Sequence, residues 1–99
     1  MSRTASRTDR NQTEIVTGLR ALGCSVQVLS GVGHGVPDIL VGAHGLNTLL
    51  EIKDGKLAHS RRMLTPDEQI WHNNWNGQVA VVNSLDEAIA EVNKVVRKG

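Results

Sequence analysis

Two short runs of strand-forming residues, separated by only three residues, constrain the fold of this chain more than any other feature. The runs PDILVGA (37–43) and NTLLEIK (47–53) flank the tripeptide HGL. Runs of this length and spacing predict a β-hairpin that turns around residues 44 and 45. A hairpin centred there places residue 38 opposite residue 51, because antiparallel partners lie at equal distances from the turn.

This register brings three polar side chains together within otherwise apolar strands. Asp38 faces Glu51 across the hairpin, and Lys53 shares the face of Glu51 because strand side chains alternate. Two facing carboxylates repel each other, and burying even one unpaired ion costs several kcal/mol. A divalent cation would compensate this charge. Ligation by carboxylates, water and a backbone carbonyl such as that of Ile52 suits Mg²⁺, and Mn²⁺ can substitute for it.

A metal at these residues would supply the chemistry of phosphodiester hydrolysis. It would lower the pKa of a bound water and stabilise negative charge on a phosphate, while the Lys53 ammonium positions the water or a phosphoryl oxygen. Taken singly, each residue is better explained as a solvated strand end, and Pro37-Asp38 as a turn that begins a strand. Only the joint pattern favours a catalytic site.

The other segments predict a single α/β domain around this hairpin. Residues 1–8 read as a polar, flexible basic arm, and residues 9–99 as one domain with the element order α-β-β-β-α-β-α. The expected elements are a helix from Asp9 that stops near Gly23, a strand in 24–30, the hairpin, a helix from Pro66 to about Gly77, a strand in 78–84 and a final amphipathic helix from Leu85. The unit from 47 to 83 predicts a parallel strand-helix-strand crossover in a mixed sheet.

The start of the second helix has the clearest local signal. Thr65-Pro66-Asp67-Glu68 is a capping box with proline at the first helical position. The following Trp71 and Trp75 are spaced for one helical face, which favours core anchors over groups that stack on bases.

Composition excludes several classes of protein. The formal net charge is +1, so any affinity for nucleic acid has to come from local basic patches. The single cysteine, Cys24, excludes an internal disulfide and fits a reducing cytoplasm. No apolar run approaches the roughly 20 residues of a membrane span, which predicts a cytoplasmic protein without membrane contact.

The arrangement of Pro37-Asp38, then Glu51-x-Lys53 on the paired strand, resembles the signature of the PD-(D/E)XK nuclease superfamily. The context GVPDILV, LLEIKDG and LTPDEQIWHNNWNGQVAVVNSLDEA is similar to the VRR-NUC branch, over most of residues 12–92. The resemblance implies a restriction-endonuclease-like α-β-β-β-α-β core with a mixed four-stranded sheet and a C-terminal helix. It also implies that Asp38 and Glu51 hold Mg²⁺, with Lys53 catalytic.

Further residues are assigned by the same resemblance. An acidic residue of the first helix maps to Glu14 as a further metal-site residue, although Glu14 could equally be an exposed carboxylate, and a catalytic glutamine of the crossover helix maps to Gln69. Expected DNA-backbone contacts come from local basic residues, whose alternative role is to keep a loop solvated: Arg10, Lys56, Arg61 and Arg62.

Small stand-alone VRR-NUC proteins look like structure-selective nucleases that cut branched DNA, such as Holliday junctions, as homodimers. The resemblance therefore predicts a Mg²⁺-dependent DNA endonuclease of this kind. The alternative is a non-catalytic module that keeps the nuclease fold and binds DNA or another protein. The intact Asp38, Glu51 and Lys53 set argues against that alternative.

Overall fold

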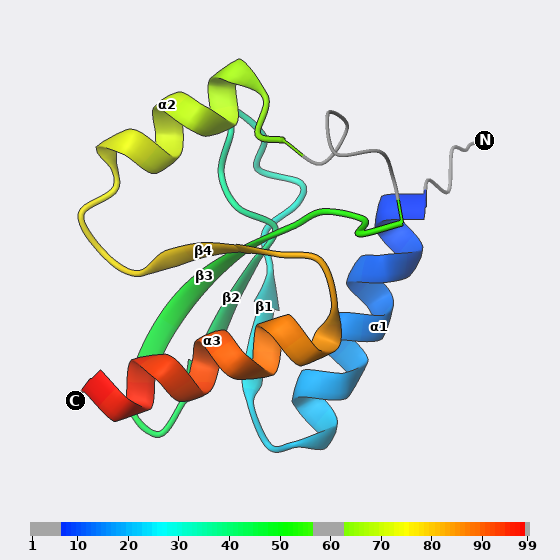
Figure 1. Cartoon of the computed structure of the whole chain (residues 1–99), viewed down its shortest axis with the longest axis vertical. Helices are drawn as coiled ribbons and strands as arrows, with labels where there is room; N and C mark the ends of the chain where they lie inside the picture. Colours follow the sequence, from blue (N-terminus) through cyan, green and yellow to red (C-terminus); the bar gives the residue numbers. More distant parts are fainter. Residues whose placement is uncertain (1–6, 57–62, 99) are drawn as a thin grey trace.

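The computed structural model describes the backbone of residues 7–56 and 63–98 and the side chains of residues 10–56 and 63–94. Its elements follow the predicted order (Figure 1): α1 (Arg7–Ala21), β1 (Ser25–Val28), β2 (Ile39–Ala43), β3 (Leu46–Ile52), α2 (Pro66–Asn74), β4 (Val79–Val82) and α3 (Leu85–Lys98). Helix α1 begins at Arg7, so the last two residues of the expected arm are helical. Residues 1–6 of that arm lie outside the described residues.

The four strands form one mixed sheet in the order β1-β2-β3-β4. β1 and β2 are antiparallel, β2 and β3 are antiparallel, and β3 and β4 are parallel, which confirms the predicted crossover. The hairpin closes at the pair Ala43 and Leu46. His44 and Gly45 have φ angles of 56° and 80°, as a two-residue turn with the twist of a hairpin requires. The pairing of Ile39 with Leu50 confirms the predicted register.

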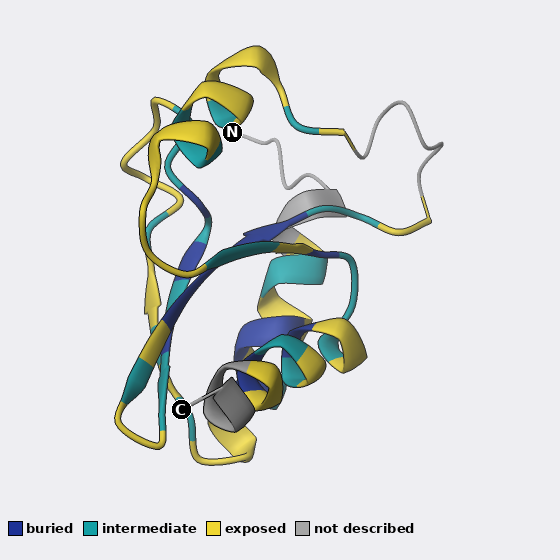
Figure 2. Ribbon diagram, turned by 60° about the vertical axis from the view of Figure 1, so that its left-hand side comes forward, coloured by how far each residue is buried: buried dark blue, intermediate teal, exposed yellow. Residues whose placement is uncertain are grey.

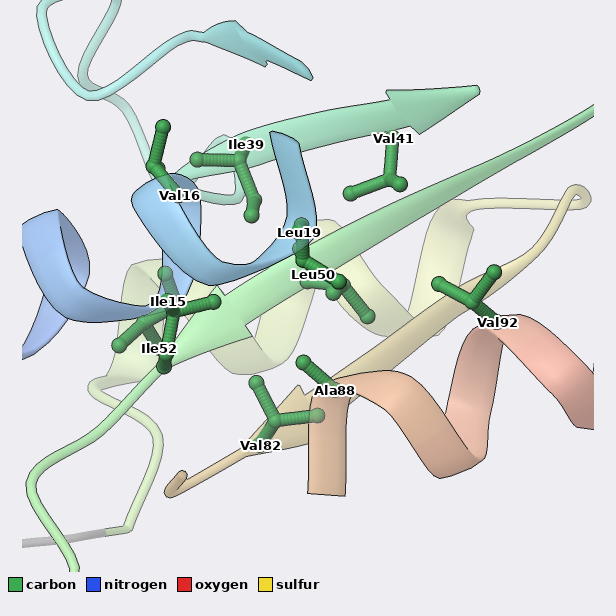
Figure 3. Close-up of a cluster of buried hydrophobic side chains, with 10 residues drawn as sticks. All are labelled: Ile15, Val16, Leu19, Ile39, Val41, Leu50, Ile52, Val82, Ala88 and Val92. Carbon is green, nitrogen blue, oxygen red and sulfur yellow. The ribbon is translucent and has the colours of Figure 1, made fainter. Parts of the chain in front are cut away.

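Helices α1 and α3 cover one face of the sheet, and the hydrophobic core lies between them and the strands (Figure 3). Ile15 and Leu19 of α1, Leu50 of β3 and Val82 of β4 have no exposed surface. Alternation along β3 therefore directs Leu50 and Ile52 into the core, while Glu51 between them faces the other side of the sheet. Within the described residues, no helix is long and apolar enough to cross a membrane.

Helix α2 lies apart from this core, beside the loop that leads into β2 (Figures 1 and 2). Gly35 of that loop has a φ of 84° and packs so closely that a Cβ would come within 2.5 Å of the Asp67 carbonyl oxygen. No residue of α2 is buried. The expectation that Trp71 and Trp75 anchor the core is wrong: Trp71 is half-buried and Trp75 is 44% exposed. Helix α2 lies beside the loop before β2 and contributes no residue to the core between the sheet and α1 and α3, so its tryptophans are not buried there.

Candidate active site

The three polar residues of the hairpin lie together where β3 ends. The Ile52 amide donates a hydrogen bond to Oδ2 of Asp38 at 2.7 Å, and the Asp38 amide donates to the Leu50 carbonyl at 3.1 Å. Lys53 Nζ lies 3.7 Å from Oε2 of Glu51. The short turn and the register of the hairpin thus bring the side chains of Asp38, Glu51 and Lys53 to one place, as the spacing in the sequence predicts.

Glu51 is a buried acid without sufficient compensating charge. Glu51 is 3% exposed. Within the described part of the chain, its Oε1 accepts no hydrogen bond. Burial, together with the negative charges of Asp38 and Glu68, raises the pKa of Glu51 to about 9, although the charge of Lys53 acts in the opposite direction. Glu51 therefore holds a proton at neutral pH unless a cation replaces it.

The carboxyl group of Asp38 lies in the same environment, and its pKa is also raised. Burial raises its pKa, although the hydrogen bond from the Ile52 amide acts in the opposite direction. The charge of Glu68 raises the pKa of Asp38 further, and the charge of Lys53 lowers it. Two adjacent carboxyl groups with raised pKa values form a site that favours a positively charged ligand.

Glu68 completes the cluster and was not predicted as a site residue. Its Oε1 accepts hydrogen bonds from Lys53 Nζ at 2.8 Å and from the Thr65 amide at 2.9 Å. The Glu68 amide donates to Oγ1 of Thr65 at 3.2 Å, so the predicted capping box is confirmed. A capping box indicates where a helix begins but not which strand the helix lies over. The sequence therefore carried no signal for the pairing of Glu68 with Lys53.

The ion pair between Lys53 and Glu68 keeps both groups charged. Burial lowers the pKa of Lys53, but the hydrogen bond and the charge of Glu68, with the charges of Glu51 and Asp38, raise it more, so the net pKa is above its usual value. Burial raises the pKa of Glu68, yet the bonds from Lys53 and Thr65 bring its net pKa below the usual value. Lys53 is therefore a fixed cation at neutral pH.

Asn11 of α1 is a second residue that sequence reasoning missed. Its side-chain amide donates to the carbonyls of Lys53 at 2.9 Å and Asn83 at 3.3 Å, which ties α1 to the ends of β3 and β4. Asn11 lies on the helix that was expected to contribute Glu14. A lone asparagine in a polar helical segment gives no indication of such a contact.

Glu14 itself faces a different pocket. Its side chain is exposed and lines a pocket of about 260 Å³ with Arg10, Asn11, Asp54 and Lys56. In the described residues, no hydrogen bond or ion pair joins Glu14 to Asp38 or Glu51. Arg10 and Lys56, which were expected to contact DNA, are both exposed and line this same pocket. Arg61 and Arg62 lie outside the described residues.

Gln69 is exposed in the first part of α2. Its amide donates to the side-chain oxygen of Asn73 at 3.0 Å, one turn along the same helix. The neighbouring Glu68, and not Gln69, makes the contact with Lys53. The structure thus gathers Asp38, Glu51, Lys53 and Glu68, while Gln69 and Glu14 lie outside this contact network.

The donor atoms of this cluster suit a hard divalent cation. Among the described residues, no three His, Cys, Asp or Glu side chains are arranged to hold a metal by themselves. Mg²⁺, however, is commonly bound through one or two carboxylates, with water and substrate phosphate completing its shell. The unpartnered Oε1 of Glu51 and the raised pKa values of Glu51 and Asp38 fit that kind of site.

Comparison with known proteins identifies a solved structure with the same fold. A VRR-NUC domain matches with a TM-score of 0.63 and 27% sequence identity, covering 94% of this chain and 97% of that chain. No family model and no curated protein matches the chain. The match confirms the predicted nuclease-like α/β fold over nearly the whole length of both chains.

Proposed function

We propose that this chain, which is similar over 94% of its length to a solved VRR-NUC domain at 27% sequence identity, is a metal-dependent DNA endonuclease. The main observation in support of this proposal is the cluster of charged side chains at the end of β3. Asp38 and the buried Glu51 supply oxygen ligands without sufficient compensating charge, and Lys53 stands beside them as a fixed cation. The cofactor in this proposal is Mg²⁺, for which Mn²⁺ can substitute.

In this proposal each residue of the cluster has a distinct role. Asp38 and Glu51, with the Ile52 carbonyl, hold the metal, which would activate a water molecule and stabilise charge on the scissile phosphate. Lys53 is held protonated by its contacts, so it acts as a positive charge toward a phosphoryl oxygen and not as a base. Glu68 orients the Lys53 ammonium, and Asn11 holds the Lys53 backbone.

The DNA backbone would lie along the basic residues near this site. Arg10 and Lys56 are exposed around one pocket, and their charge attracts phosphate although the whole chain is nearly neutral. Arg61 and Arg62 belong to the same proposal from the sequence alone. Gln69 and Glu14 remain proposed supporting residues; each would have to turn toward the metal when DNA binds.

The proposal extends to two further properties: the protein cuts branched DNA selectively, and it acts as a homodimer. One chain offers one cluster of Asp38, Glu51 and Lys53, and symmetric cutting of a junction needs two sites related by a two-fold axis. Val92 of α3 is 7% exposed and packs in its own core, so it is not available for a partner. The segment 31–36, with Val32 54% exposed, is the better candidate surface.

A cleavage assay tests the nuclease proposal directly. Linear duplex, flap and four-way DNA are incubated with Mg²⁺, Mn²⁺ or a chelator, using the full chain and the Asp38→Asn and Lys53→Ala variants. Asp86→Asn and Lys94→Ala are matched controls, because they remove the same charges from exposed positions of α3. We expect metal-dependent cleavage by the wild type and both controls only. No cleavage of any substrate with either metal would overturn the proposal in favour of a non-catalytic module.

A further inference from the structure

A pocket on the outer side of α2 is not used by the proposed catalytic cluster. It has a volume of about 300 Å³ and is lined by His34, Asp67, Ile70, Trp71, Asn74 and Trp75. The rings of Trp71 and Trp75 are stacked, with centroids 4.7 Å apart and planes inclined by 18°. Ile70 is 59% exposed and Trp75 is 44% exposed. The fold therefore presents aromatic and aliphatic surface that the core does not cover; because the two indoles face each other, a ligand can stack only on an outer face of the pair.

The rim of this pocket carries polar groups that are free to bind a ligand. The side chains of His34, Asp67 and Asn74 make no hydrogen bond with any described residue. Flat aromatic surface next to unpartnered donors and acceptors matches a nucleobase, which has two stacking faces and a polar edge. The Asp67 carboxylate can accept hydrogen bonds from the amino groups of cytosine or adenine.

The same carboxylate argues against the DNA backbone as the occupant. Asp67 would repel a phosphate, and among the described residues no lysine or arginine lines the pocket to offset that repulsion. A base that is paired within a duplex has its polar edge occupied and its faces stacked on neighbours. The pocket therefore suits a base that has left the duplex.

The position of the pocket relates it to the catalytic cluster. Trp71 lies on α2 and Trp75 is the residue that caps its C-terminal end, so their backbones lie about 5 Å and 10 Å beyond that of Glu68 along the helix axis, at 1.5 Å per residue. Glu68 contacts Lys53. The pocket therefore lies on the element that holds Glu68, near the catalytic cluster proposed above.

We propose that this pocket binds an unpaired nucleobase of the substrate strand, stacked on Trp75 close to the scissile phosphate. The inference rests on the proposed nuclease function and specifies its substrate class. A duplex with an unpaired strand beside the cut, such as a flap, can bind the cluster with its backbone and the pocket with an unpaired base. Fully paired DNA can bind only the cluster.

Tryptophan fluorescence reports directly on this pocket. The chain has two tryptophans and no tyrosine, so its emission comes from Trp71 and Trp75 alone. The full chain is titrated in chelator, which prevents cleavage, with flap DNA, oligo(dC), an abasic oligonucleotide of equal length and a blunt duplex. We expect quenching by the flap and by oligo(dC), and little by the abasic strand or the duplex.

Several outcomes would overturn the proposal. Equal quenching by the abasic strand would mean that only the backbone binds near α2. Quenching by an arginine-rich peptide but not by unpaired DNA would assign the pocket to a basic protein partner through cation–π contact. Because the titration needs no cleavage, base-dependent quenching in a chain that cuts nothing would overturn the nuclease function and leave the base site standing.

Substitutions at Trp75 test the stacking contact. Trp75→Ala should weaken flap binding roughly tenfold, and Trp75→Phe should restore most of the affinity because it keeps an aromatic face. Leu22→Ala is the matched control, since Leu22 is 62% exposed on the chain segment after α1 and does not line the pocket. Flap binding that is unchanged in Trp75→Ala, with a native melting temperature, contradicts the proposal.

Discussion

Lys53, at the end of β3, and Glu68, in the first turn of α2, share a hydrogen bond of 2.8 Å that joins the sheet to the helix outside the core. The same Glu68 oxygen accepts from the Thr65 amide and so also caps α2. One carboxylate thus sets both the start of the helix and the position of the proposed catalytic ammonium. The start of α2 and the placement of Lys53 are therefore coupled.

Glu68→Gln should separate these two roles. Glutamine can still accept from the Thr65 amide as part of a capping box, but it removes the negative charge beside Lys53. We expect single-turnover cleavage to fall by up to about a hundredfold through misplacement of the ammonium, with little loss of helix stability. Glu91→Gln removes the exposed partner of Lys94 and is the control. Equal activity of Glu68→Gln and wild type would exclude an orienting role.

Asp38→Ala and Glu51→Ala should abolish cleavage while DNA binding is kept or becomes tighter. Both side chains are proposed metal ligands, and neither substitution removes a positive charge that attracts the phosphates; Glu51, which holds a proton without metal, contributes a negative charge only when a cation is bound. Cleavage and equilibrium binding are measured on the same flap substrate, with Asp86→Ala as a control for charge. Turnover retained by both site variants would exclude the mechanism.

The stability of the metal-free protein should fall as pH rises from about 7 to 9. The pKa of Glu51 is about 9 in the folded chain against 4.5 for the free side chain, so the folded state binds more protons in this range. Burial lowers the pKa of His72 below 6.5, which acts in the opposite direction only at lower pH. The measurement is the melting temperature in chelator.

Glu51→Gln is the variant that checks this pH dependence. An uncharged amide of similar shape should raise the melting temperature at pH 8 and reduce its slope with pH. Asp38→Asn should act in the same direction, because the pKa of Asp38 is also raised. A wild-type melting temperature that stays constant between about pH 7 and 9 would contradict the raised pKa of Glu51.

Removal of basic residues should weaken DNA binding and its dependence on salt. Arg10→Ala and Lys56→Ala, and separately Arg61→Ala with Arg62→Ala, should each reduce the log-log salt slope by about one unit per lost phosphate contact. Lys94→Ala, on the exposed surface of α3, should leave the slope unchanged. An unchanged slope in either pair of variants would remove that pair from the DNA-binding surface.

The sequence by itself determined the hairpin and, with it, most of the proposed catalytic cluster. A two-residue turn at His44 and Gly45 sets the register, and strict alternation then decides that Asp38, Glu51 and Lys53 share one face. The start of α2 was equally local, because a capping box involves only four consecutive residues. Such features depend on neighbours in the chain and can be read without knowledge of the rest of the fold.

Only the tertiary structure decided where α2 lies and which side chains meet it. The apolar spacing of Trp71 and Trp75 predicts a buried face, but α2 packs beside the loop before β2 and outside the core, so these rings line a surface pocket. The pairing of Glu68 with Lys53 and the reach of Asn11 to β3 join residues distant in the chain. Such contacts depend on how whole elements pack, and periodicity within one element carries no information about the element it meets.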